Sequence, residues 1–167
     1  MCPSLDVPTA NLSANTLCWL QRVVTAGLGV AGAIRGRFRA VQVWIGPAGS
    51  TINDATHVPP APENVPHLVD NLLSWWKTTH VQLRTADKLV VAEGLAKLHH
   101  GLLTIYPFLH ANGRVARCVI DQAARELLNQ GVSADLTTDP QSYFNALREA
   151  DKGNLNLLTR QVLASLS

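Results

Sequence analysis

The residues with the clearest chemical potential are two arginines that follow a small-residue turn in IYPFLHANGRVAR, residues 105–117. The turn, Ala111-Asn112-Gly113, precedes a segment with helical periodicity. A turn that opens a helix exposes backbone N–H groups at the positive end of the helix dipole, where anions bind. Arg114 and Arg117 are three positions apart, so they share one helix face and both can reach phosphate oxygens. The pattern predicts phosphate binding, and the alternative is an ordinary Asn-Gly helix start with two solvated arginines.

Helices on both sides of this turn must hold it in place. Apolar residues recur at helical spacing through most of the chain, and the first helix has Ser13 or Asn11 as its cap. Gly131 is expected to end the helix that carries the arginines, and Asp139-Pro140 is a typical helix start. The predicted helices run from Leu12 to the glycines at 27–32, from Val65 to about Trp76, and over about 86–104, 113–129, 139–150 and 155–166.

One segment has the composition of strands. Val41-Gln42-Val43 alternates apolar and polar residues, residues 46–50 form a Gly/Pro turn, and residues 55–58 can return as a partner strand. The fold class predicted is therefore all-α, a helical bundle that carries one small β-hairpin. We expect a single domain over residues 12–167 and a flexible N-terminal tail over residues 1–11.

The bulk composition limits the function classes. A chain of 167 residues with 47% hydrophobic and 16% charged residues suits one soluble domain. Its net charge of +2 gives no argument for nucleic acid or an anionic membrane surface. The uncharged run over 23–34 is shorter than the roughly 20 apolar residues of a membrane span, and residues 1–10 lack signal-peptide features. Three widely spaced cysteines, Cys2, Cys18 and Cys118, predict reduced thiols and a cytoplasmic location.

Three other patterns favour structural explanations. GLGVAG at 27–32 matches G-x-G-x-x-G, but it follows a helix and leads into strands, the reverse of the dinucleotide-binding order. His99 and His100 are adjacent on a predicted helix, so their side chains diverge and no metal-ligand set is predicted. Trp75 and Trp76 lie at the spacing of core residues on a helix, so we expect them to pack in the core.

Residues 105–117 resemble the Fic motif, H-P-F-x-D/E-G-N-G-R-x-x-R. Upstream, residues 39–46 resemble the strand that opens the Fic flap hairpin, and residues 57–75 resemble its return and the next helix. The similarity covers most of residues 12–165 in the family's order. It implies a helical Fic core whose flap docks a target segment by strand addition, here through Val41, Val43, Ile45 and His57. It also implies transfer of AMP from ATP, or of another phosphate-containing group, to a protein hydroxyl.

The motif matches the family at some positions and departs at others. Pro107, Phe108, Asn112, Gly113, Arg114 and Arg117 match, which places phosphate binding at Asn112, Gly113, Arg114 and Arg117. Ala111 is a mild departure. Tyr106 replaces the histidine that acts as the general base in the family. A phenol, with a usual pKa near 10, stays protonated at neutral pH and is a poor general base there compared with imidazole, whose pKa is near 6.5. His110 replaces the acidic residue that binds Mg²⁺ in the family, and Mg²⁺ is a hard ion that prefers oxygen donors. The resemblance therefore implies Mg²⁺ with ATP as the cofactor, but the protein ligand of the metal is missing.

The resemblance also bears on partners. Autoinhibited relatives carry an S/T-x-x-x-E-G/N helix, and none of the glutamates Glu63, Glu93, Glu126 and Glu149 lies in that pattern. A separate antitoxin-like chain or a second copy of this chain could supply the inhibitory contact. Alternatively, an altered site needs no inhibition.

Three functions are consistent with these residues. The first is a degenerate Fic-fold protein that binds a nucleotide or another phosphate-containing ligand, with AMP transfer weak or lost. The second is an active transferase with altered chemistry, in which His110, one helical turn along, supplies the imidazole or Tyr106 accepts the modification. The third is a helical scaffold without ligand chemistry.

Overall fold

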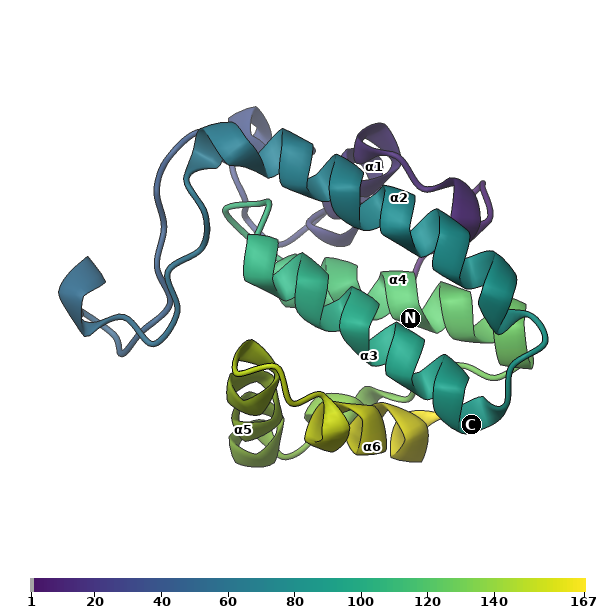
Figure 1. The fold of residues 1–167 in the computed structure, drawn as a ribbon. Helices are drawn as coiled ribbons and strands as arrows, with labels where there is room; N and C mark the ends of the chain where they lie inside the picture. Colours follow the sequence, from purple (N-terminus) through teal and green to yellow (C-terminus); the bar gives the residue numbers. More distant parts are fainter. Residues whose placement is uncertain (1) are drawn as a thin grey trace.

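The computed structural model describes residues 2–167 as helices in stacked layers (Figure 1). In Figure 1, α2 crosses one side, α3 and α4 occupy the middle, and α5 and α6 cover the other side. Short 3-10 turns connect several of these elements. The helices are α1 (Ala14–Val24), α2 (Val65–Leu83), α3 (Lys88–Ile105), α4 (Asn112–Leu128), α5 (Pro140–Asp151) and α6 (Asn156–Ser165).

Side-chain caps fix several helix starts where the sequence predicts them. Ser13 accepts a hydrogen bond from the backbone N–H of Thr16 at the start of α1. Asp139 accepts from Ser142 at the start of α5, where Pro140 takes the first helical position. These two predictions are confirmed. The predicted stop of α4 at Gly131 is wrong, because Asn129 takes the left-handed conformation, with φ of 54°, and ends the helix.

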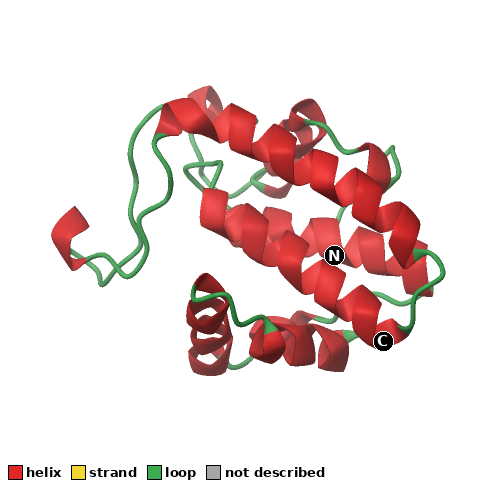
Figure 2. Cartoon of the chain, viewed as in Figure 1, coloured by secondary structure: helices red, strands yellow, loops and turns green. Residues whose placement is uncertain are grey.

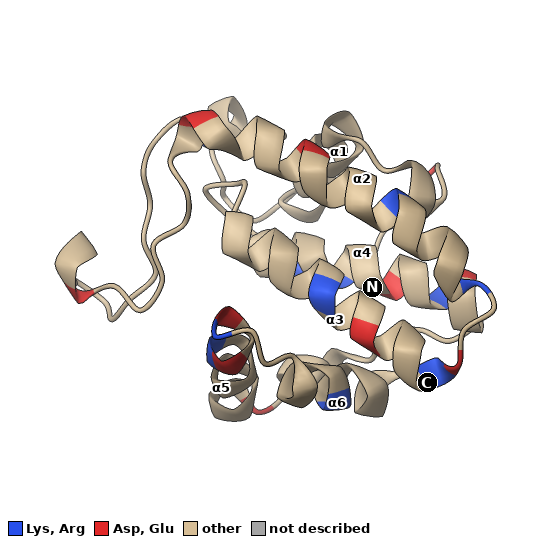
Figure 3. Ribbon diagram, in the orientation of Figure 1, with Lys and Arg blue, Asp and Glu red and all other residues tan. Residues whose placement is uncertain are grey.

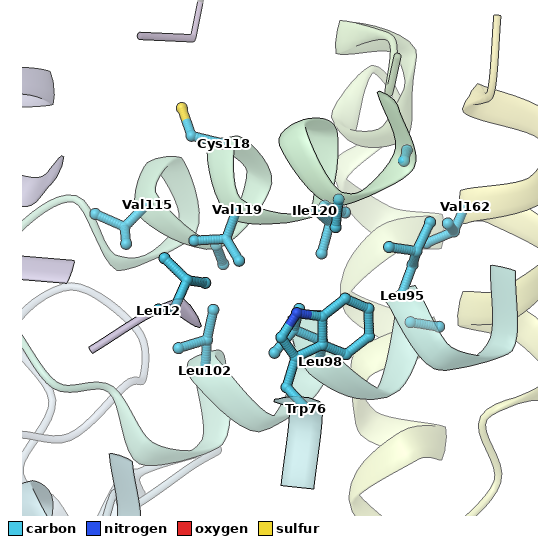
Figure 4. Close-up of a cluster of buried hydrophobic side chains, with 14 of the residues drawn as sticks. Leu12, Trp76, Leu95, Leu98, Leu102, Val115, Cys118, Val119, Ile120 and Val162 are labelled. Carbon is cyan, nitrogen blue, oxygen red and sulfur yellow. The ribbon is translucent and has the colours of Figure 1, made fainter. Parts of the chain in front are cut away.

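The core lies around α3, which packs against α2, α4, α5 and α6. Figure 4 shows Trp76 of α2 facing Leu98 of α3, with Ile120 of α4 and Val162 of α6 close by. Trp76 is completely buried and Trp75 packs against the cluster, so the core assignment of both tryptophans is confirmed. Burying a large side chain stabilises a fold by about 1.5–3 kcal/mol. The loop between α3 and α4 is therefore held by two well-packed helices.

The predicted hairpin is only partly realised. Residues 40–60 extend away from the helices in Figure 1 and are drawn as loop and one 3-10 turn in Figure 2. Within residues 2–167 no β-strand forms, and the two arms of this segment meet at one antiparallel bridge, Ile45 with His57. The physical reason is local: Thr51 and Asp54 form a capping box around a 3-10 turn, and Pro59 and Pro60 have no N–H for a ladder. We call residues 40–60 the flap segment.

The segment expected to be a flexible tail packs against the helices. Leu5 and Thr9 are buried. The backbone N–H of Thr9 donates to both carboxylate oxygens of Glu126 in α4, at 3.0 and 3.1 Å, and the Thr9 hydroxyl donates to the same group. His80 of α2 also contacts this carboxylate, at 3.1 Å. Glu126 therefore joins the N-terminal segment to two helices.

Candidate phosphate-binding site

The motif loop, residues 106–111, is bracketed by two residues in the left-handed conformation. Tyr106, with φ of 52°, ends α3 and donates its backbone N–H to Leu102. Ala111, with φ of 67°, directly precedes α4. Left-handed geometry costs a non-glycine residue about 1 kcal/mol or more, so the surrounding contacts must hold this loop in place. Ala111 occupies the position where the Fic motif has a glycine, which adopts this conformation without strain.

Asn112 provides the contacts that close the loop. Its Nδ2 donates to the carbonyl oxygen of Phe108 at 2.7 Å, and its Oδ1 accepts from the Phe108 N–H at 2.9 Å. Both Asn112 and Phe108 are buried. Because both polar atoms of its side chain bond the backbone of Phe108, Asn112 orders the turn.

The start of α4 has the properties of an anion site. Among residues 2–167, no side chain caps this helix end. The N–H groups of the first turn therefore lie at the positive end of the helix dipole and have no acceptor within the helix. A Cβ built on Gly113 would lie 3.3 Å from Nη1 of Arg117, which shows that the guanidinium folds back over this turn. Arg117 and the helix start thus converge on one place.

Arg114 and Arg117 line the same cavity along α4, with a volume of about 910 Å³. Arg114 is exposed, and its Nη1 donates to the carbonyl of Val24 at the end of α1, at 3.3 Å. The spacing prediction that both arginines share one face is thereby confirmed. The cavity walls come from the N-terminal segment, α1, α4 and the stretch after α4: Cys2, Pro3, Ser4, Val23, Val24, Cys118, Asp121, Gln122, Arg125, Val132, Ser133 and Ala134.

A buried pair of polar side chains lies within reach of the charge of Arg117. The Tyr143 hydroxyl of α5 lies 2.7 Å from Nε2 of His99 in α3, and the positive charge of Arg117 acts on both groups. Burial raises the pKa of Tyr143 to about 12. Burial, with the positive charge of Arg117 as a second cause, lowers the pKa of His99 to about 3. The pair is therefore neutral at physiological pH and places no negative charge beside Arg117.

Tyr106 and His110 both lie in the motif loop, at opposite ends. Tyr106 is partly buried, whereas His110 is exposed. The residues between them are not helical, so the expected spacing of one helical turn is wrong. The cause is the ring between Phe108 and Asn112 together with Pro107, which prevents continuation of α3. The carbonyl of His110 accepts a hydrogen bond from Gln21 of α1, at 3.3 Å.

Arg39 is a positioning residue that the sequence analysis missed. It is 3% exposed, and its guanidinium donates to the carbonyls of Val41 and Pro60, at the two ends of the flap segment. It also donates to the carbonyls of Ile105 and Tyr106, where α3 meets the motif loop. The sequence did contain a signal for this role. Arg39 is the one charged residue in the apolar, strand-like run from Phe38 to Ile45, and a charge that is buried in such a run needs hydrogen-bond partners.

The four residues assigned to target docking lie on the flap segment with different exposures. Ile45 exchanges backbone hydrogen bonds with His57, at 2.9 and 3.2 Å, and His57 Nε2 lies 3.1 Å from the carbonyl of Thr104 in α3. Val41 is 54% exposed and Val43 is partly buried.

A second cavity, of about 430 Å³, lies between the flap segment, α3 and α5. Its lining is mostly apolar and includes Phe144, which is 54% exposed. The flap segment itself carries one charged residue, Asp54, and is otherwise neutral (Figure 3). Other residues on this cavity are Ile45, Gly46, Thr56, His57, His100, Leu103, Thr104, Pro140, Gln141, Leu147, Arg148 and Asp151.

The donor set at the motif loop does not fit Mg²⁺. Residues 105–117 contain no carboxylate, and His110 offers nitrogen to an ion that prefers oxygen. Within residues 2–167, no group of three or more His, Cys, Asp or Glu side chains is placed to hold a metal ion. A phosphate ligand at this site would therefore interact with the arginines and the helix start directly.

No helix within the described residues is both long and apolar enough to span a bilayer.

Comparisons with known proteins agree with this architecture. The protein adenylyltransferase Fic of Nematostella vectensis is 27% identical over 129 residues, which are 76% of this chain and 26% of that protein. The chain thus spans about a quarter of the length of that relative. Fic-1 of C. elegans, residues 134–508, superposes with a TM-score of 0.70 at 23% identity, covering 93% of this chain and 41% of that one. BepC of Bartonella tribocorum, with bound AMPPNP, gives a TM-score of 0.73 at 14% identity, covering 97% and 78%.

The family profile described as the Fic/DOC family matches residues 11–124, which include α1, the flap segment, the motif loop and most of α4. This match covers more than half of the chain and contains both the flap segment and the motif arginines. The chain belongs to the Fic/DOC family.

Proposed function

We propose that this protein binds a nucleotide or a similar phosphate-containing ligand at the start of α4, and that ordinary AMP transfer to protein hydroxyls is weak or lost. The observation that carries the proposal is the position of Arg117, whose guanidinium lies over Gly113 at an uncapped helix start. Arg114 lies on the same cavity. Two guanidinium groups and free N–H groups around one turn suit the oxygens of a di- or triphosphate.

The lost chemistry follows from two positions. Tyr106 offers a phenol where the Fic motif has an imidazole base, and a positioned general base contributes about 10²–10⁴ in rate. His110 leaves the loop without a carboxylate for Mg²⁺. Both changes affect the transfer step, while the ring between Phe108 and Asn112 and both arginines, which serve binding, are in place.

The relatives support the nucleotide part of the proposal. BepC is described with bound AMPPNP, an ATP analogue, and the Nematostella protein is named an adenylyltransferase. We also propose that a segment of a target protein pairs with the flap segment, and that an antitoxin-like chain or a second copy of this chain inhibits the site.

Calorimetric titration tests the binding proposal. ATP, ADP and pyrophosphate are titrated with and without Mg²⁺ into the parent, Arg114→Ala, Arg117→Ala and Arg160→Ala. Arg160 is an exposed arginine on α6 and serves as the matched control. We expect binding by the parent and the control, and at least about tenfold weaker binding after either motif arginine is removed, since a charge-assisted hydrogen bond contributes roughly 1.5–3 kcal/mol. Absence of binding to all three ligands contradicts the proposal.

The second candidate is a transferase with altered chemistry, and the feature that favours it is Tyr106. This residue is partly buried at the end of α3, and Arg39 holds its carbonyl, so its hydroxyl is presented from a fixed backbone. Tyr106 could accept the transferred group, or His110 could act as the base. Intact-mass measurement after incubation with labelled nucleotides separates the cases. A mass gain on Tyr106 indicates self-modification, a gain on a lysate protein indicates a transferase, and no gain with any donor favours the binding protein.

A further inference from the structure

A buried glutamine of α1, Gln21, contacts the motif loop from outside the loop. Gln21 is 1% exposed, so both polar atoms of its side chain need partners inside the protein. Its Nε2 donates to the carbonyl oxygen of His110 at 3.3 Å, and its Oε1 accepts from the backbone N–H of Gly36. Gln21 therefore joins α1 both to the motif loop and to the segment that leads into the flap.

Gly36 fixes the direction of the glutamine amide. Gly36 is left-handed, with φ of 71°, and a Cβ built on it would lie 3.2 Å from Cβ of Arg22 and 3.2 Å from the carbonyl oxygen of Cys18. Only a glycine allows this close approach to α1 without displacing its neighbours. Because the Gly36 N–H takes Oε1, the other end of the amide, Nε2, is directed to His110.

The bond to His110 orients the peptide that leads into α4. This peptide is trans, so the Ala111 N–H points away from Gln21 when the His110 carbonyl points towards it. Among residues 2–167, no backbone carbonyl accepts the Ala111 N–H and no side chain caps the helix. A left-handed Ala111 followed by a helical Asn112 turns the N–H groups of residues 111–113 towards one place, as in backbone anion sites.

We infer that Gln21 is a positioning residue of the phosphate site, and that it holds the Ala111 N–H towards the ligand. The inference rests on the proposed function, because it concerns the same site. The guanidinium of Arg117 lies over Gly113 at this turn, so a phosphate held by Arg117 also meets the N–H groups that Gln21 orients.

The backbone of Ala111 explains why the loop needs this contact. The left-handed conformation is unfavourable for alanine, so a contact from outside the loop must hold it. Without Gln21, the peptide between His110 and Ala111 can rotate to relieve the strain, and fewer N–H groups then face the phosphate. A glycine at position 111 adopts the same conformation without strain and depends less on Gln21.

Calorimetric titration of the full chain with pyrophosphate tests the role of Gln21. Gln21→Met keeps a side chain of similar length and removes both hydrogen bonds. We expect it to bind about three- to tenfold more weakly than the parent, because one neutral hydrogen bond has a modest net effect. Adding Ala111→Gly should raise the affinity of Gln21→Met more than it raises that of the parent. A general loss of stability would not produce this non-additivity.

Gly36→Ala tests the same contact without changing the glutamine or the loop. Its matched control is Gly29→Ala, since Gly29 is also left-handed, with φ of 70°, but nothing lies within 4 Å of a Cβ built on it. Both variants carry the strain of a left-handed alanine, and only Gly36→Ala displaces its segment from α1. We expect weaker pyrophosphate binding by Gly36→Ala and parent-like binding by Gly29→Ala. This pair keeps the test valid if Gln21→Met folds poorly.

A measurement without ligand separates this inference from the proposed function. In nitrogen–proton correlation NMR spectra of the free protein, the amide signals of Ala111 and Asn112 should shift or broaden in Gln21→Met and stay close to the parent's in Gly29→Ala. A parent that does not bind pyrophosphate contradicts the proposed function and this inference together. A parent that binds it, with equal affinity in Gln21→Met or with unchanged signals of Ala111 and Asn112, overturns the role of Gln21 alone.

Discussion

The guanidinium of Arg39 donates through Nε to the carbonyl oxygen of Tyr106 at 2.8 Å, and the backbone N–H of Arg39 donates to Pro107 at 2.9 Å. The same guanidinium donates to carbonyls at both ends of the flap segment. One side chain therefore joins the base of the flap to the first residues of the motif loop. Burial lowers the pKa of Arg39, but the pKa of an arginine is high enough that the group stays charged.

Arg39→Met should release the flap from the motif loop. The substitution leaves the four carbonyls that Arg39 serves with fewer donors, and we expect a loss of about 2–4 kcal/mol in the free energy of unfolding. Urea denaturation measures the loss, and amide hydrogen exchange should rise at residues 41–60. Arg37→Met is the matched control, because Arg37 is exposed. Equal stability of the two variants contradicts the assignment.

Asn112→Ala should open the ring that shapes the motif loop. It removes both hydrogen bonds to Phe108 and leaves buried backbone groups without partners, which costs about 1–3 kcal/mol. Phosphate binding should weaken as well, because the loop sets the start of α4. Asn112→Asp keeps the acceptor for the Phe108 N–H but places a carboxylate against its carbonyl. It should bind phosphate no better than Asn112→Ala, and parent-like affinity in both variants would show that Asn112 does not shape the site.

The features that the sequence predicts are those with local causes. Ser13 and Asp139 cap helices because a short polar side chain reaches an N–H within its own turn. The shared face of Arg114 and Arg117 follows from helix periodicity. The Arg39 contacts and the pairing of Thr9 with Glu126 depend on packing between distant segments, for which no local pattern exists. The hairpin predicted for the flap segment is wrong for another local reason: the capping box of Thr51 and Asp54, together with Pro59 and Pro60, interrupts the alternation on which the prediction depended.

His99 should make stability depend on pH. Burial, followed by the charge of Arg117, lowers its pKa from 6.5 to about 3, whereas the unfolded chain keeps a pKa near 6.5. Between these values the unfolded state binds a proton that the folded state does not, so stability present above pH 6.5 falls as the pH decreases towards 3. The slope from this group approaches about 1.4 kcal/mol per pH unit.

Urea unfolding of the parent and His99→Gln at several pH values between 7.5 and 4.5 isolates this contribution. The contacts of His80 with Glu126 and of His100 with Asp151 are present in both proteins, so the difference between the two proteins reports on His99. We expect a shallower decline for His99→Gln below pH 6.5, even if the variant is less stable at pH 7.5. Identical slopes would show that folding does not lower the pKa of His99.

Restoring the two altered motif positions should restore transfer. Tyr106→His returns an imidazole base to a left-handed position, which histidine tolerates better than most residues, and His110→Asp returns a carboxylate for Mg²⁺ on the loop. The double variant should gain Mg²⁺-dependent AMP transfer of at least about 10²-fold over the parent, measured as labelled AMP on the protein itself. Tyr106→His alone should gain less, because the phosphates would still lack their metal ligand. A double variant that binds ATP with Mg²⁺ and transfers nothing would mean that the altered site extends beyond these two residues, with the flap segment the next place to change.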